Sequence, residues 1–377
     1  MNWIILASVL LFGLFYFSIC IRLLSGFKAL SGGTAETHPF VSVIISARNE
    51  EKNIESCLNA VLHQTYPQNK FEVIVINDRS EDRTGDIVRT MMRVSSNLKC
   101  LDITSRHPEM APKKWALQQG ITAAGGEIIL STDADCRPQY GWIASMVSFF
   151  EEDVALVAGY SPLTAMQSGS VLHAFIALEA LGLAGVTAGS FGAGLPLTCT
   201  GRNLAYRKSV FQSLGGFRSI GHFVSGDDDL LLHHIAHSTD DRVRFAVDPR
   251  SMVPAVPARS FWEFFHQRTR HASKGFHYHT GLKLGLIGVY FFNLSLLTAL
   301  FFPSVYPWLL LVFGLKVCLE FALLDRTARL FSQCRLLKCF PVAMLIHVPY
   351  VVIFGLWGQF GKFKWKETRY SKQMNRN

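Results

Sequence analysis

The sequence predicts an α/β fold in which a parallel sheet, built from βαβ units, lies between apolar membrane helices. Short runs rich in Val and Ile alternate with segments of helical period from residue 41 to residue 132, which predicts parallel strands joined by crossover helices. Uncharged apolar stretches flank this region at both ends, and the chain is 49% apolar, more than a water-soluble domain needs. A soluble central domain held at a membrane accounts for both patterns.

The N-terminal run, residues 3–21, has no charge and reaches the ~20 residues that a membrane-spanning helix needs. No basic segment precedes it and no small-residue cleavage motif follows it, so we expect an uncleaved anchor over residues 1–26 rather than a signal peptide. Arg22 and Lys28 lie on its downstream side only, which predicts that the chain continues in the cytoplasm.

Strands are expected next at 41–46, 71–77, 98–104 and 127–132, with helices over 49–64, 80–96 and 113–124 between them. In such sheets ligands bind at the carboxyl ends of the strands. Polar, mostly acidic segments follow three of these strands: "ARNE", "NDRSEDRT" and "TDADC". No glycine-rich phosphate loop follows any strand, which argues against a dinucleotide or P-loop enzyme.

The C-terminal region holds further apolar runs at 282–302, 304–324 and 340–360. The loop between the last two is basic and the segment between the first two is uncharged, which again places the basic side in the cytoplasm. Three full spans would put the basic tail outside, so we expect the last run, which contains Pro349, to enter the membrane and return. The sequence thus divides into an anchor (1–26), a central domain (39–258), an interfacial helix (259–281), membrane helices (282–361) and a basic tail (362–377).

The net charge of +9 is compatible with nucleic-acid binding, but the basic residues concentrate beside the apolar runs, where they meet anionic lipid head groups. We therefore expect a membrane partner and no nucleic acid. The eight cysteines form no C-x-x-C pair, and a cytoplasmic domain keeps them reduced.

Two acidic side chains follow the fourth strand. Asp133 and Asp135 are two residues apart in an extended segment, which points both carboxylates the same way. Such oxygen donors suit Mg²⁺ or Mn²⁺, which in turn favour phosphate oxygens. The alternative is a solvated turn in which one Asp caps the next helix. A zinc site at His233 and His237 is disfavoured, because no acidic or Cys partner stands at a customary ligand spacing.

Seven segments occur in the order and at about the spacing found in family 2 glycosyltransferases: "SVIISARNEEKNI", "VIVINDRSEDRT", "KKWALQQGI", "STDAD", "TGRNLAYRKSVFQSLGGF", "SGDDDLLL" and "QRTRH". The ordered set, over roughly residues 40–275, resembles this family, including membrane-bound members such as ceramide glucosyltransferase and cellulose synthase. The resemblance implies a Rossmann-like, glycosyltransferase A-type fold that binds a nucleotide sugar. It also implies metal-dependent transfer of the sugar, with inversion, to an acceptor hydroxyl.

The resemblance assigns roles to individual residues. Glu50 and Asp78 hold the nucleotide, Lys114 lies near the diphosphate, Asp133 contacts the donor, and Asp135 ligates Mg²⁺ or Mn²⁺. Taken alone, a helix-start carboxylate explains Glu50 better, and an Asx turn explains Asp78 better.

In "SGDDDLLL", alignment with the family on Gly226 makes Asp228 the catalytic base. The attacking hydroxyl must lose a proton, and a carboxylate within hydrogen-bond reach accepts it. Three adjacent acids repel one another, which raises the proton affinity of at least one. The alternative role, neutralising the dipole of the following helix, suits Asp227 or Asp229.

Gln267 and Arg270 match the family motif Q-x-x-R-W, and we expect them to stabilise the leaving diphosphate, since Arg binds two phosphate oxygens at once. His271 stands where the family has Trp, so stacking on the acceptor does not carry over. Arg202 and Asn203 are candidate donor-side or acceptor-side residues; the alternative for them is a strand with a polar edge.

Residues 171–199 are apolar enough to imitate a span, but a crossing there would put Asp135 and Asp228 on opposite sides of the membrane. We therefore expect a helix and a glycine-rich loop that do not cross. His173 and Glu179 also argue against a lipid-exposed span.

These expectations combine into a multi-pass cell-membrane enzyme with a cytoplasmic catalytic domain, whose partners are a nucleotide diphosphate sugar and a lipid or glycan acceptor. One alternative is a processive polysaccharide synthase. A second is a membrane nucleotidyltransferase, which releases pyrophosphate rather than a nucleoside diphosphate. A third is a silent sugar-nucleotide-binding partner of another membrane protein.

Overall fold

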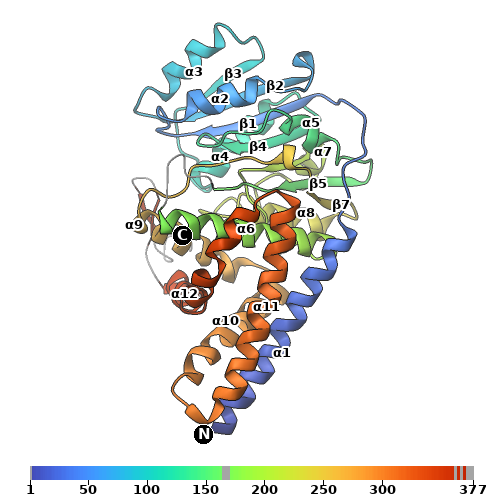
Figure 1. Cartoon of the computed structure of the whole chain (residues 1–377). Helices are drawn as coiled ribbons and strands as arrows, with labels where there is room; N and C mark the ends of the chain where they lie inside the picture. The colour runs from blue at the N-terminus through green and yellow to red at the C-terminus, as the bar shows by residue number, and fades with distance from the viewer. Residues whose placement is uncertain (1, 164–169, 361–362, 366–367, 371–377) are drawn as a thin grey trace. The chain divides into compact units, whose positions relative to one another are not determined.

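The computed structural model describes residues 2–163, 170–360, 363–365 and 368–370 (Figure 1). The chain forms two compact units. The sheet unit comprises residues 29–168 and 194–257, and the helical unit comprises residues 1–28, 169–193 and 258–377. The chain therefore passes between the units more than once.

The sheet unit is built on a seven-stranded sheet with the order β3-β2-β1-β4-β6-β5-β7. The strands expected from the sequence are present and parallel: β1 (Val41–Ala47), β2 (Phe71–Asp78), β3 (Leu98–Ile103) and β4 (Ile128–Asp133). Three strands that the sequence did not predict extend the sheet: β5 (Val154–Gly159), β6 (Leu204–Arg207) and β7 (Arg242–Ala246). Because β6 runs antiparallel to both β4 and β5, the sheet is mixed.

Helices connect these strands. They are α2 (Ile54–Leu62), α3 (Thr84–Met92), α4 (Pro112–Ala123), α5 (Trp142–Val147), α7 (Lys208–Ser213) and α8 (Asp229–Ser238), with 3-10 turns η2 (Gln68–Lys70) and η3 (Pro249–Ser251). α4 packs on β1 and β2, and α3 packs on β2 and β3. Gly120 permits the close approach of α4, because a Cβ there would lie 2.5 Å from Cδ1 of Ile76.

The carboxyl ends of β1, β2 and β4 lie side by side. The chain runs from β1 outward to β2 and β3, whereas β4 returns to the other side of β1. The register pairs Ala47 with Asn77 and Ser46 with Asp133. Such a reversal of strand order opens a crevice for a ligand in α/β sheets. The polar segments that follow these strands therefore meet at one edge.

The helical unit contains α1 (Asn2–Gly26), α6 (Val171–Gly192), α9 (Phe261–Ala272), α10 (Thr280–Ala299), α11 (Tyr306–Leu330) and α12 (Phe340–Phe360). Short elements complete the described chain: η1 (Phe27–Ala29), η4 (Ser273–His277), η5 (Pro303–Val305), η6 (Cys334–Cys339), β8 (Phe363–Trp365) and β9 (Thr368–Tyr370). By length and composition, α1, α6, α10, α11 and α12 are each able to cross a membrane. The predicted basic tail, 362–377, lies outside the described residues apart from β8 and β9.

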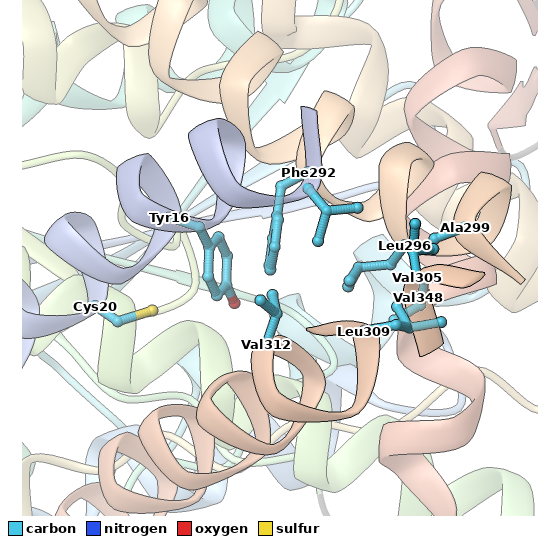
Figure 2. Close-up of a cluster of buried hydrophobic side chains, with 10 residues drawn as sticks. Tyr16, Cys20, Phe292, Leu296, Ala299, Val305, Leu309, Val312 and Val348 are labelled. Atoms are coloured by element: carbon cyan, nitrogen blue, oxygen red, sulfur yellow. The ribbon is translucent and has the colours of Figure 1, made fainter. Parts of the chain in front are cut away.

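Apolar side chains hold α1, α10, α11 and α12 together. Figure 2 shows their cluster, in which the ring of Tyr16 stacks on that of Phe292 with centroids 4.6 Å apart. Leu296 from α10 and Val312 from α11 complete the contact. Large apolar side chains also remain exposed on all four helices, as contact with lipid requires.

A polar network borders this cluster. Lys316 and Glu320, one turn apart on α11, form an ion pair of 2.5 Å, and Nζ of Lys316 lies 3.0 Å from Nδ1 of His347 on α12. Tyr16 on α1 donates its hydroxyl proton to Glu320. Lys316 is completely buried. Because a charge in an apolar surrounding needs a partner, the network ties three helices together.

Lys316→Met should lower the thermal unfolding midpoint of the detergent-solubilised protein. The substitution removes the buried counter-charge of Glu320, and breaking such a pair costs about 3–5 kcal/mol in soluble proteins. The double variant Lys316→Met/Glu320→Leu should recover part of the loss, because no unpaired charge remains. A single variant as stable as the wild type would show that the pair does not stabilise the unit.

α6 packs against α1 and α11 within the helical unit. Glycine allows the backbones to touch, because a Cβ on Gly189 would lie 2.6 Å from the carbonyl oxygen of Leu23, and one on Gly185 would lie 2.5 Å from Oγ1 of Thr327. The strands before and after α6, β5 and β6, pair in one sheet. Both ends of α6 therefore lead into strands of the same sheet, and the expectation that 171–199 does not cross a membrane stays a prediction.

α12 runs without a break through Pro349. Proline has no N–H, so the carbonyl of Leu345 lacks its helical donor, yet the helix continues. A re-entrant path requires the chain to reverse within the run, and this helix does not reverse. The interruption that the sequence suggested at Pro349 is therefore absent, and the re-entrant expectation loses its basis.

Candidate active site

Two loops at the carboxyl edge of the sheet are hydrogen-bonded to each other. After β1, the N–H of Asn49 donates to Oγ of Ser80 at 3.1 Å, and the N–H of Glu50 donates to Oγ1 of Thr84 at 2.8 Å. Asn49 and Arg79 adopt the left-handed backbone region, with φ of 53° and 52°. Each chain therefore turns sharply as it leaves its strand, and the two turns brace one another.

Glu50 and Asp78, the predicted nucleotide-binding acids, lie in these loops. Asp78 is buried, and its Oδ1 accepts a hydrogen bond from Nε of Arg79 at 2.7 Å. Glu50 accepts one from Nδ2 of Asn53 at 2.8 Å, just ahead of α2. The structure thus brings both carboxylates to the same edge of the sheet.

Asp133 ends β4 and Asp135 follows it. Burial and the neighbouring Asp133 carboxylate raise the pKa of Asp135, while Arg202 acts in the opposite direction. A divalent cation would stabilise the charge that burial penalises, and the two carboxylates are the hard oxygen donors that Mg²⁺ and Mn²⁺ prefer. The described residues hold no group of three His, Cys, Asp or Glu side chains placed for a metal. Oxygens of a bound diphosphate and water would have to complete the coordination.

Lys113, which the sequence analysis did not select, lies among these acids. Its Nζ is 2.9 Å from Oδ1 of Asp133 and 2.9 Å from Oδ2 of Asp227. Burial opposes the charge of Lys113, but the two carboxylates raise its pKa above the ordinary value. Lys113 therefore joins β4 to the acidic segment before α8 and carries a positive charge at the site.

Lys114 points elsewhere. Its ammonium donates to the carbonyl oxygens of Ile220, Phe223 and Ser225 at 2.9, 2.8 and 2.9 Å. The side chain is buried and holds the loop ahead of α8. Lys113 thus contacts acidic side chains and Lys114 contacts backbone carbonyls, while the expected place of Lys114 near the diphosphate stays a prediction.

Lys113→Met and Lys114→Met should differ in kind. The first should raise KM for the sugar donor by roughly 10- to 100-fold, the effect of losing a charged hydrogen bond, with little change in thermal midpoint. The second should lower the midpoint, because three carbonyls lose their donor at about 1–3 kcal/mol each. Donor kinetics and thermal unfolding of both variants check this, and an inverted pattern would restore Lys114 to the donor site.

The three adjacent acids make different contacts. Asp227 pairs with Lys113. Asp228 caps α8, since its Oδ1 accepts the N–H of Asp229 at 2.8 Å, and its Oδ2 accepts the N–H of Gly201 at 3.2 Å. Asp229 is buried, and Oδ1 accepts the N–H of Cys199 at 2.8 Å. Asp229 therefore has a structural role at the start of α8.

Arg202 and Asn203, which are adjacent in the sequence, have different surroundings. The charge of Arg202 acts on Asp135, which places Arg202 on the donor side. Asn203 is completely buried: its Oδ1 accepts from Nε1 of Trp142 at 2.9 Å, and its Nδ2 donates to the carbonyls of Tyr160 and Ser251. The side-chain amide of Asn203 is therefore used in the fold, and its role towards a donor or an acceptor stays a prediction.

Gln267, Arg270 and His271 lie on α9, in the helical unit. Ser260 caps this helix by accepting the N–H of Glu263 at 3.2 Å, and Glu263 in turn accepts the N–H of Arg259 at 2.8 Å. Gln267 and Arg270 are three residues apart and share one face of the helix.

The candidate zinc histidines contact backbone. Nε2 of His233 lies 2.9 Å from the carbonyl oxygen of Leu197, and Nδ1 of His237 lies 2.8 Å from that of His233. The eight cysteines are free. These groups fit the fold rather than a metal.

Comparison with known sequences agrees with the geometry. Residues 42–215 match the profile of glycosyl transferase family 2. The chain is similar to glycosyltransferase AglE of Haloferax volcanii, with 32% identity over 62% of this chain and 72% of the relative. It is also similar to the probable glycosyltransferase YdaM of Bacillus subtilis, with 32% identity over 48% of this chain and 43% of that protein.

A solved structure shows the same fold. The mannosyltransferase PcManGT of Pyrobaculum calidifontis, solved with GDP-Man and Mn²⁺, matches with a TM-score of 0.58 and 20% identity, over 90% of this chain and 99% of that one. The predicted α/β fold, flanked by apolar helices at both ends, is confirmed.

Proposed function

The chain belongs to glycosyl transferase family 2, and we propose that it transfers a sugar, with inversion, from a nucleotide diphosphate to a lipid-linked or membrane-associated acceptor hydroxyl at the cytoplasmic face of the membrane. The observation that carries this proposal is the pairing of Lys113 with Asp133 and Asp227 at the edge of the sheet where β1, β2 and β4 end side by side. The apolar helices support a membrane-associated acceptor.

The donor is held at the ends of β1, β2 and β4. Glu50 and Asp78 accept hydrogen bonds from the base and ribose, as buried or braced carboxylates do for hydroxyl and amino donors. Lys113 presents its ammonium to the diphosphate while its two carboxylate partners fix its position. A Mg²⁺ or Mn²⁺ ion held by Asp135, with Asp133 beside it, would supply positive charge for the leaving diphosphate.

Bond formation requires a base and further stabilisation of the leaving group. Asp228 accepts the proton of the attacking hydroxyl, and its two contacts with backbone N–H groups hold the carboxylate in place. Gln267 and Arg270 on α9 donate to the diphosphate oxygens as negative charge develops there. His271 stands in the position of the family's Trp and is a candidate contact for the acceptor.

A donor panel tests this function. Purified protein is incubated with lipid extract, Mn²⁺ and each of several nucleotide sugars, and the release of nucleoside diphosphate and the mass of new glycolipid are measured. One donor should give both products in equal amounts. Release of pyrophosphate would identify a nucleotidyltransferase, and a distribution of long glycans would identify a processive synthase. The absence of any product from every donor would contradict the proposal.

A further inference from the structure

α9 has two faces with different partners. At about 100° per residue, Phe264, Arg268 and Ala272 lie within about 80° of one another, and Arg270 points about 120–160° away from them. Gln267 lies at the border of the first face, about 60° from Phe264 and about 100° from Arg268. Phe264 stacks on Tyr350 of α12 with centroids 6.4 Å apart. A Cβ on Gly358 of α12 would lie 2.3 Å from the Cβ of Ala272. The first face is therefore pressed against α12.

A buried ion pair fixes the same face to α6. Nη2 of Arg268 lies 2.5 Å from Oε2 of Glu179, and the hydroxyl of Tyr350 donates to Oε1 of Glu179 at 2.6 Å. The Arg268 side chain also lies over the ring of Phe264, with its guanidinium carbon 5.2 Å from the centroid. The carboxylate of Glu179 on α6 therefore contacts both Arg268 of α9 and Tyr350 of α12.

We propose that Glu179, Arg268 and Tyr350 are positioning residues that set the rotation of α9 and so the direction in which Gln267 and Arg270 point. This inference rests on the proposed function. Apolar side chains would stabilise the contact at least as well, since burying an ion pair costs desolvation. An ion pair is more directional than an apolar contact, because the guanidinium of Arg268 must meet the carboxylate of Glu179.

Both charged residues of this network are visible in the sequence, but neither predicts the other as its partner. Glu179 counted only as evidence against a lipid-exposed span, and Arg268 stood between the two motif residues. In the structure, Glu179 on α6 and Arg268 on α9 form an ion pair with each other.

Glu179→Gln and Tyr350→Phe test the proposal. Each removes charge or a single hydroxyl and keeps the size of the side chain. Measured well below the unfolding transition, kcat should fall by ~10- to 100-fold, as for a misplaced catalytic group, with KM for the donor within about threefold of wild type. Glu179→Gln should also lower the thermal midpoint, because Arg268 loses its buried counter-charge, whereas Tyr350→Phe should leave the midpoint nearly unchanged. Tyr306→Phe is the matched control, because the Tyr306 hydroxyl donates to the carbonyl of Leu300 in the same unit, and it should leave kcat unchanged.

The decisive measurement is a double-mutant cycle with Arg270→Ala. If Glu179 acts through Arg270, Glu179→Gln should cause no further loss of kcat in the Arg270→Ala background. Losses that multiply would overturn the proposal, as would full kcat in both single variants or a kcat that falls only in step with the thermal midpoint.

Failure of the wider function has a different signature. In that case the wild-type protein transfers no sugar from any donor, or Arg270→Ala retains full activity. The second result removes α9 from the donor site, and this inference with it.

Discussion

Asp228→Asn should lower kcat by ~10²- to 10⁴-fold, the usual contribution of a general base, while donor affinity in Mn²⁺ stays near the wild-type value. Asparagine retains an oxygen that accepts the N–H of Asp229, so the cap of α8 is kept. It gives up the longer contact with the N–H of Gly201. The substitution therefore removes the proton acceptor and leaves the local fold. Steady-state kinetics and a donor-binding titration measure the two effects separately.

The neighbouring acids provide matched controls. Asp229→Asn should lower the thermal midpoint and change kcat less, because Asp229 accepts hydrogen bonds from the hydroxyl of Thr198 and the N–H of Cys199. Asp227→Asn should raise KM for the donor, since it removes one of the two anchors of Lys113. Normal turnover in Asp228→Asn would exclude it as the base, and a collapse of kcat in Asp227→Asn alone would transfer the role to Asp227.

Asp135→Asn should abolish the stimulation of donor binding by Mn²⁺. The amide carries no charge for a divalent cation, and losing several kcal/mol of metal-assisted binding corresponds to ~100-fold or more in affinity. Affinity in Mn²⁺ should therefore fall to the value that the wild type shows in EDTA. Titration of the purified protein with the nucleotide sugar, in each of the two conditions, measures this.

Asp102→Asn is the control for this titration. Asp102 is the penultimate residue of β3 and accepts a hydrogen bond from Nδ2 of Asn77 at 2.7 Å, so it lies near the same sheet edge without a predicted role in metal binding. Any loss of affinity for the nucleotide sugar in Asp102→Asn should be equal in Mn²⁺ and in EDTA. If Asp135→Asn also loses the same donor affinity in Mn²⁺ as in EDTA, relative to the wild type, the Asp135 carboxylate does not act through a metal.

The first half of the sheet could be predicted because its strands are buried on both faces. Parallel strands in this setting are continuous apolar runs, and β1 and β2 are almost completely buried. β6 spans only Leu204–Arg207, too short to show a period. β7 is the exception, because its charged and apolar residues alternate with the period of a half-buried strand.

At the site, the family motif selects Lys114, whereas its neighbour Lys113 is the lysine that contacts Asp133 and Asp227. Lys113 and Lys114 are adjacent on α4, so their side chains point about 100° apart. A shift of one position in the alignment therefore exchanges a lysine that contacts two carboxylates, Lys113, for one that contacts three backbone carbonyls, Lys114. Asn203 could not be assigned from sequence, because its partners Trp142, Tyr160 and Ser251 come from distant segments.

The strand order also governs how the protein is made. β5 pairs only with β6 and β7, and both are synthesised after α6. When the nascent chain has just emerged as far as α6, β5 has two open edges, and the most apolar segment of the central region follows it directly. Both edges of β5 are therefore filled only after β6 and β7 have been made, so the second half of the sheet closes last.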